Sequence, residues 1–281
     1  MSFGIGQPVH RIEDPRFLTG RGTYVDDIEL PRMAFGVVVY AQVAKAKIKT
    51  LDITAAECMP GVLDILTGDD IQVDQIGSLP PAFMPSDMGG PEGYKAVRPI
   101  LAERYSKFVG DRIAFVVAES EPQARDAAEA LKVDLEIQGA SVFSETAASS
   151  DAPLVHEEAG SNICYELQMG DANAAEAGLT AADHVVSLKI YNNRITTNAM
   201  EPRGCIGHFD PAQDHFTLWS STQNIHGLRM FLAQHVFRIP ESKLRVIARD
   251  VGGGFGMKHS VHQEEALVLW ASKRTGRPVK W

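Results

Sequence analysis

The sequence has few cysteines. Its 281 residues include three, Cys58, Cys164 and Cys205, and none belongs to a Cys-x-x-Cys pair. A structural zinc site or an iron–sulfur cluster held by this chain alone is therefore not expected, because both need several ligands at set spacings. If the protein carries out redox chemistry, its electrons must leave through another carrier.

The sequence also lacks excess basic charge and long apolar runs. Its net charge of −9 argues against nucleic acid as a partner, because nucleic-acid binding leaves a basic patch or stripe. No run of about 18 apolar residues occurs, so no membrane span is predicted. The N-terminal residues 1–8 have neither the basic segment nor the apolar core of a signal peptide, and a cytoplasmic location is the default prediction.

Two common glycine motifs are missing. In a G-x-G-x-x-G dinucleotide fingerprint, the third glycine would fall on Met257 or His259. A phosphate-binding P-loop needs Gly-Lys-Ser/Thr, and Lys258 has Met257 and His259 beside it instead. No nucleophile elbow or zinc-protease motif is present either. A generic nucleotide-binding enzyme is therefore the least favoured function.

What the sequence does contain is a glycine loop over 251–258, with four glycines and Phe255 in 252–256. Residues 243–249 before it alternate like a strand, and residues 264–271 after it predict a helix. A glycine loop between a strand and a helix is a common binding place for anionic cofactors, because it presents bare main-chain N–H groups. A tight turn without a ligand is the structural alternative.

The length suggests two domains, with a linker at 141–151. We predict an arm without regular structure over 1–20, a mixed α/β domain over 21–145 and a second domain over 155–281. The predicted elements are as follows. Strands are expected at 34–40, at 47–53 pairing with it, and at 62–67, 113–118, 132–137, 184–190, 215–220 and 278–281; helices at 54–59 with Thr54 as N-cap, 121–131 and 224–237; and a long loop at 77–97.

Polar residues near the predicted strand ends are further candidates. Gln223 follows the strand at 215–220, and carboxyl ends of strands favour ligands, although simple helix capping is an alternative. In isolation, Glu201 and Arg203 are typical of a surface turn with a weak ion pair. His259 and His262 lack a third ligand, and a helix start with exposed histidines is favoured over a metal site.

Several of these segments together resemble a known family. They are residues 5–22 with 24–27, residues 108–134, residues 200–204, residues 222–224 and the glycine loop. In this order they resemble the N-terminal part of the molybdenum-binding large subunit of the xanthine dehydrogenase/aldehyde oxidase/aerobic carbon monoxide dehydrogenase family. The resemblance implies an α+β, mixed α/β fold: a hammerhead-type domain followed by the first part of a molybdenum-cofactor-binding domain, truncated or split.

The resemblance also implies a cofactor, molybdenum held by molybdopterin, in its cytosine dinucleotide form. Gly253, Gly254, Phe255 and Gly256 would bind it with Gln223, which would hydrogen-bond an oxo ligand. Gln223 and Phe255 are the catalytic candidates, and no residue of this chain is expected to ligate the metal directly. The implied reaction is oxidative hydroxylation of an aldehyde or N-heterocycle, or oxidation of carbon monoxide, with water as the oxygen source.

The implied partners are a [2Fe-2S] subunit, an FAD subunit, a second molybdenum-subunit chain if the subunit is split, and a small-molecule substrate. The large subunits of this family are far longer than this chain, so the catalytic base is expected outside it. The alternative function is a non-catalytic scaffold or assembly fragment of such a complex.

Overall fold

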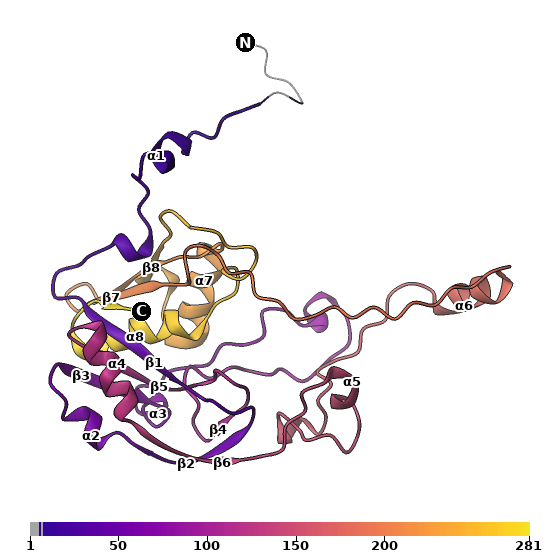
Figure 1. The fold of residues 1–281 in the computed structure, drawn as a ribbon, viewed down its shortest axis with the longest axis horizontal. Helices are drawn as coiled ribbons and strands as arrows, with labels where there is room; N and C mark the ends of the chain where they lie inside the picture. Colours follow the sequence, from indigo (N-terminus) through magenta and orange to yellow (C-terminus); the bar gives the residue numbers. More distant parts are fainter. Residues whose placement is uncertain (1–5, 7) are drawn as a thin grey trace.

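The computed structural model describes residue 6 and residues 8–281, which form two β-sheets (Figure 1). The larger sheet has seven strands in the order β3 (Val62–Thr67), β5 (Arg112–Ala118), β1 (Ala34–Tyr40), β10 (Val279–Lys280), β7 (Cys205–Asp210), β8 (His215–Ser220) and β9 (Leu244–Ile247). The smaller sheet has the order β4 (Tyr105–Ser106), β2 (Ala46–Asp52) and β6 (Lys132–Ile137).

The helices confirm the predicted mixed α/β fold. The α-helices are α1 (Asp14–Leu18), α2 (Thr54–Glu57), α3 (Asp70–Val73), α4 (Glu121–Ala130), α5 (Ser144–Ala147), α6 (Ala172–Ala181), α7 (Ile225–Phe231) and α8 (Gln263–Thr275). Four 3-10 turns, η1 (Val25–Asp27), η2 (Pro85–Met88), η3 (Glu157–Ala159) and η5 (Glu241–Lys243), and the π-helix η4 (Leu232–Phe237) complete the set.

Helices α8 and α4 cover opposite faces of the larger sheet. Strand β5, between β3 and β1, is buried on both faces, which explains its continuous apolar sequence. Its residues Phe115 and Val117 join the main core with α8, whereas Ala114 and Val116 face the smaller core beside α4. A Cβ atom on Gly207 of β7 would lie 2.5 Å from the α8 main chain, so glycine permits this close packing.

The seven-stranded sheet joins the two predicted domains. Strand β10 pairs in parallel with β1, with Ala34 opposite Val279, and antiparallel with β7, with Val279 opposite Gly207. The first predicted domain therefore supplies three strands of the sheet and the second supplies four. The domain boundary at 145–155 remains a prediction from the sequence.

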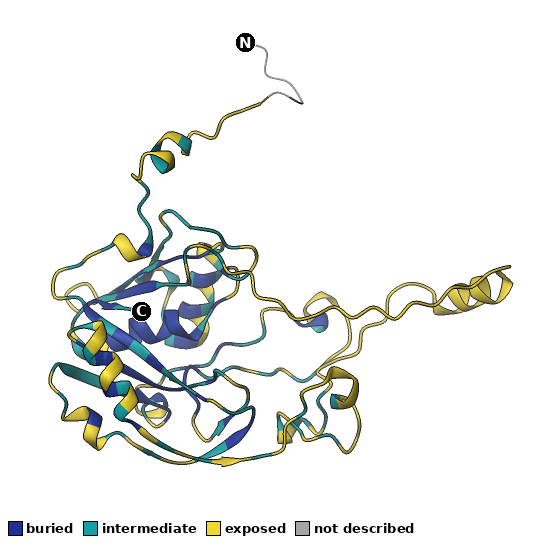
Figure 2. Ribbon diagram, in the orientation of Figure 1, coloured by how far each residue is buried: buried dark blue, intermediate teal, exposed yellow. Residues whose placement is uncertain are grey.

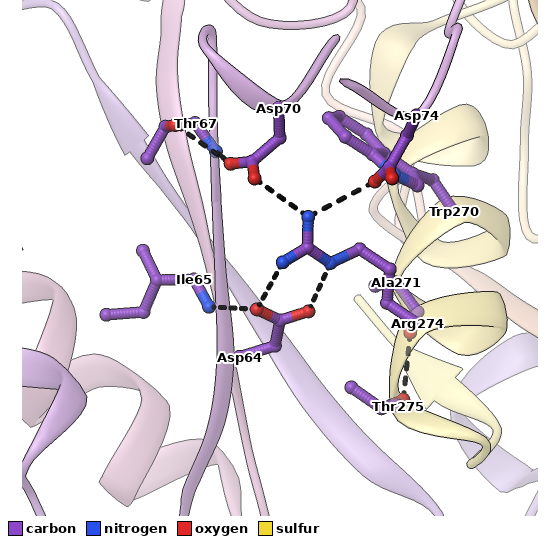
Figure 3. A network of polar contacts seen from close by, with 9 residues as sticks. All are labelled: Asp64, Ile65, Thr67, Asp70, Asp74, Trp270, Ala271, Arg274 and Thr275. Atoms are coloured by element: carbon purple, nitrogen blue, oxygen red, sulfur yellow. Dashed lines mark hydrogen bonds and ion pairs between the residues drawn. The ribbon is translucent and has the colours of Figure 1, made fainter. Parts of the chain in front are cut away.

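Charged groups connect the last turn of α8 to the first domain. Arg274 donates to Asp64 of β3 at 2.7 Å, to Asp70 of α3 at 2.8 Å and to Asp74 at 3.1 Å (Figure 3). The Trp270 indole, also on α8, donates to Asp74 at 2.6 Å. These contacts hold α8 against β3 and α3.

Some predictions about local structure were wrong. Strand β2 does not pair with β1; it lies in the smaller sheet, because both edges of β1 are taken by β5 and β10. Thr54 is not the N-cap of α2: Ile53 holds that position, and the Thr54 N–H bonds the Asp52 carboxylate at 3.0 Å. The predicted arm does contain a short helix, α1, and Arg16 within it pairs with Asp250 near the glycine loop.

The strand predicted at 184–190 is also absent. These residues lie on an extended arm that carries α6 away from the body of the molecule (Figures 1 and 2). Val185, Val186, Leu188 and Ile190 are all exposed. An alternating sequence forms a strand only beside another strand, and no described segment lies in that position.

Candidate functional site

The glycine loop and Gln223 lie together at one edge of the larger sheet. Strands β8 and β9 are parallel neighbours, so the segments that follow them leave the sheet on the same side. The Gln223 main-chain N–H donates to the Lys258 carbonyl at 2.9 Å, and its side-chain Oε1 accepts from the Gly256 N–H at 3.1 Å. The structure thus brings the candidate residues from both segments into contact.

The loop backbone needs its glycines. Gly253 has φ +100° and Gly256 has φ +87°, a region that side chains disfavour. A Cβ atom on Gly254 would lie 2.4 Å from the Gln223 carboxamide carbon, so glycine lets that carboxamide lie across the loop. Phe255 itself has φ +50° and is 73% exposed. A strained, exposed aromatic residue points to a role other than packing.

The loop presents unpaired hydrogen-bond donors. Within the described part of the chain, the main-chain N–H groups of Gly253, Gly254 and Phe255 donate no hydrogen bond. The Gln223 amide nitrogen also has no partner among the described residues. Its orientation is fixed, because only the carboxamide oxygen can accept from the Gly256 N–H. The cluster therefore offers several free N–H donors, which suit an anionic or oxo group.

A buried ion pair lies directly under the loop. The Lys258 ammonium is buried and donates to the Glu201 carboxylate at 2.9 Å. Glu201 also accepts from the Gly252 N–H at 2.7 Å and from the Ser221 hydroxyl at 2.5 Å. Burial raises the pKa of Glu201, but the hydrogen bonds from Ser221, Gly252 and Lys258 outweigh it and leave that pKa below its usual value.

Glu201 and Arg203 do not form the exposed ion pair that their spacing suggested. Arg203 instead donates to Glu264 in the first turn of α8 at 3.1 Å, and Arg112 of β5 donates to the same carboxylate at 2.6 Å. Glu264 is fully buried. Burial raises its pKa, and the two guanidinium groups outweigh this and lower it.

The sequence did not reveal this cluster of buried charges. Adjacent acids in the first turn of a helix are typical of exposed residues that favour the helix N-terminus. Their partners Arg112 and Arg203 are far away along the chain. A small cavity of about 10 Å³, lined by Glu264, Glu265, Lys258 and others, lies beneath the loop and holds a water molecule at most.

The two histidines have different surroundings. His259 is exposed, as expected, whereas His262 is half-buried at the N-cap of α8, with its Nε2 3.0 Å from the Met257 carbonyl. Burial, followed by the charge of Arg203, lowers the pKa of His262. Residue 6 and residues 8–281 contain no group of three metal-ligating side chains, and no helix there is long and apolar enough to cross a membrane.

Two family models match the chain in sequence order. Residues 19–138 match the aldehyde oxidase and xanthine dehydrogenase a/b hammerhead domain, and residues 155–281 match the molybdopterin cofactor-binding domain. These two domains, in this order, make the chain a molybdopterin cofactor-binding protein of the aldehyde oxidase and xanthine dehydrogenase class. The chain belongs to the xanthine dehydrogenase/aldehyde oxidase/carbon monoxide dehydrogenase family and corresponds to the N-terminal part of those subunits.

Individual relatives agree with this assignment. The chain is 32% identical to the carbon monoxide dehydrogenase large chain of Afipia carboxidovorans and 35% identical to the nicotine 6-hydroxylase large subunit of Paenarthrobacter nicotinovorans, with 99% of this chain covered in both alignments. Quinoline 2-oxidoreductase from Pseudomonas putida 86 superposes with a TM-score of 0.90, at 32% identity over 99% of this chain and 34% of that one. The chain spans 34% and 33% of the two curated relatives.

Proposed function

We propose that this chain is part of the large subunit of a molybdenum hydroxylase and that its glycine loop and Gln223 bind molybdenum–molybdopterin. One observation carries the proposal: the unpaired N–H groups of Gly253, Gly254 and Phe255 lie beside the free amide nitrogen of Gln223. These free donors fit the oxygen atoms that an oxidised metal centre and a pterin present. The residues therefore fit the group.

Each residue of the loop has a separate task in this proposal. Gln223 would donate a hydrogen bond from its amide nitrogen to an oxygen atom of the bound cofactor, and the main-chain N–H groups of the loop would offset negative charge on that atom. The exposed Phe255 ring covers one side of the site and orients a substrate against it. The cofactor itself supplies the two-electron oxidation and the water-derived oxygen.

We propose that the complete enzyme oxidatively hydroxylates an aldehyde or an N-heterocycle, or oxidises carbon monoxide. The named relatives act on carbon monoxide, nicotine and quinoline, and each of these substrate classes stays open for this chain. A cytosine dinucleotide form of the cofactor, a [2Fe-2S] subunit and an FAD subunit belong to the same proposal, and so does a cytoplasmic location. Acid hydrolysis that releases cytidine monophosphate tests the dinucleotide form.

The proposal includes further large-subunit polypeptide that packs on the extended arm. Large apolar side chains are exposed along it: Ile163, Tyr165, Leu167, Met169, Leu179, Val185, Val186, Leu188, Ile190, Tyr191, Ile195 and Met200. Exposed apolar surface of this extent marks an interaction site. The alternating segment at 184–190 suits strand pairing. Hydrogen exchange over 163–199 should slow strongly in the assembled complex, and unchanged exchange there would exclude this surface.

The proposal is tested by purifying the chain with the products of its neighbouring genes. Molybdenum is measured by inductively coupled plasma mass spectrometry, and the pterin by fluorescence after oxidation. The Gln223→Ala variant should lower turnover by about a hundredfold or more if Gln223 stabilises charge in the transition state. Gln213→Ala, in the exposed β7–β8 turn, is the matched control. Absence of molybdenum from an active complex would refute the proposal, and an inactive complex without it would favour the scaffold alternative.

A further inference from the structure

Glu201 forms hydrogen bonds with both main-chain groups of Gly252, at the upstream end of the glycine loop. The Gly252 N–H donates to the Glu201 carboxylate at 2.7 Å, and the Glu201 N–H donates to the Gly252 carbonyl at 3.1 Å. Ser221, the residue directly after β8, donates to the same carboxylate oxygen at 2.5 Å. Gly252 is therefore held to a side chain that is itself attached to the sheet.

Lys258 anchors the downstream end of the loop to the same residue. Its ammonium donates to the Glu201 carboxylate at 2.9 Å and to the Glu201 carbonyl at 2.7 Å. The Lys258 carbonyl accepts from the Thr222 hydroxyl at 3.1 Å and from the Gln223 N–H at 2.9 Å. Lys258 thus connects Glu201 with the segment that positions the Gln223 side chain.

The burial of this lysine requires an explanation. Lys258 is 1% exposed, and a buried ammonium is costly unless a charge and hydrogen bonds compensate it. Glu201 is the carboxylate that pairs with it in the described chain. The five residues 253–257 between the two anchors include three glycines, which lose much conformational freedom when ordered. Without both anchors, this stretch has few contacts to hold its donors in place.

We infer that Glu201 and Lys258 form a positioning pair that fixes the glycine loop and Gln223 in the geometry needed to receive the molybdenum cofactor. The inference rests on the proposed function for its ligand, whereas the ordering of the loop is independent of it. Neither residue is catalytic. The pair acts through the main chain of 252–258 and keeps the N–H donors preorganised before the cofactor arrives.

Hydrogen–deuterium exchange of the chain itself tests the ordering step. Glu201→Gln and Lys258→Met should each speed exchange of peptides over 251–259 by about tenfold, while peptides from β5 keep their rates. Lys45→Met is the matched control, because Lys45 is also a buried lysine with one carboxylate partner, Glu157, far from the loop. Unchanged loop exchange in both variants, or an equal increase throughout the chain, would overturn the inference.

Glu201→Gln and Lys258→Met each leave a buried charge unpaired, which can prevent folding. Two milder variants keep the test decisive in that case. Ser221→Ala removes one hydrogen bond from Glu201 without removing a charge, and Glu201→Asp retracts the carboxylate while retaining its charge. Both should still speed loop exchange, and the double variant Glu201→Gln/Lys258→Met should speed it less than the two single effects combined. Unchanged exchange in both milder variants contradicts the inference.

The positioning of the cofactor is read separately in the assembled complex. Glu201→Gln should lose molybdenum several times faster on dialysis and shift the electron paramagnetic resonance signal of the reduced metal. Retained molybdenum and an unchanged signal, despite a loosened loop, would refute the positioning role. If the wild-type complex contains no molybdenum, the proposed function fails, and the exchange experiment still decides whether Glu201 and Lys258 order the loop.

Discussion

The buried carboxyl group of Glu265 should make stability depend on pH. Glu265 lies in the first turn of α8 and accepts hydrogen bonds from the Ser220 hydroxyl at 2.7 Å and from the His262 N–H at 2.9 Å. These bonds lower its pKa, but burial outweighs them and raises it to about 7 from 4.5. In the folded protein, the neutral acid therefore persists at pH values where an unfolded chain has already lost the proton.

The sign follows from proton binding. Between pH 4.5 and about 7, the folded state binds one more proton at Glu265 than the unfolded state. The free energy of unfolding therefore contains a contribution that is complete below pH 4.5 and is lost as pH rises through about 7. At about 1.4 kcal/mol per pH unit, the loss reaches about 3 kcal/mol.

The Glu265→Gln variant should remove this slope. Glutamine has the same shape, its oxygen can accept from the His262 N–H, and its amide can donate to Ser220. Urea titrations at intervals from pH 4.5 to pH 8, followed by tryptophan fluorescence, give the free energy of unfolding of both proteins. The stability difference between variant and wild type should move by about 3 kcal/mol across this range, in favour of the variant at high pH.

Because the variant and the wild type are compared at each pH, the contributions of other groups that titrate in the same range cancel. Glu176→Gln, an exposed change on α6, is the control and should follow the wild type at every pH. Parallel stability curves for wild type and Glu265→Gln would show that Glu265 is ionised in the folded protein at neutral pH, and the account of this buried acid would be wrong.

Three further changes probe the packing of α8, each by urea titration. Arg274→Ala should lower the free energy of unfolding by about 1 kcal/mol, because it removes contacts to three carboxylates. Arg277→Ala, which loses one exposed ion pair, should lower it by only about a few tenths of a kcal/mol. Arg112→Met should lower the free energy of unfolding by about 3 kcal/mol, because the buried Glu264 carboxylate loses one of its cationic partners. Adding Glu264→Gln should restore part of the lost stability. Gly207→Ala should cost about 2 kcal/mol or more, because its Cβ overlaps the α8 main chain. A loss below about 0.5 kcal/mol for either Arg112→Met or Gly207→Ala would contradict the corresponding contact.

The sequence predicted those features that depend on neighbouring residues. The apolar run of β5 and the helix after the glycine loop both follow from local composition. The sequence patterns identified Gln223 and the glycine loop only as two separate candidates, and only the family resemblance assigned them to one site. Parallel pairing of β8 with β9 brings them together, and local patterns do not reveal which strands pair.

Features that depend on distant partners could not be predicted. The pair of β1 and β2 was expected from proximity in sequence, yet β1 pairs with β10 at the far end of the chain. Glu264 gave no local sign of burial, because only the folded chain brings Arg112 and Arg203 to it. The alternating segment at 184–190 had the composition of a strand but no strand beside it.

The arrangement around α8 explains how the first domain influences a loop that it does not build. Glu264 in the first turn of α8 pairs with Arg112 of β5, and Arg274 in the last turn pairs with Asp64 of β3. Both ends of α8 are therefore held by strands of the hammerhead domain, with charges whose signs also suit the helix dipole. Because Lys258 lies only a few residues before α8, the position of that helix sets where the downstream anchor of the loop can lie. The two predicted domains thus behave as one frame for the candidate site.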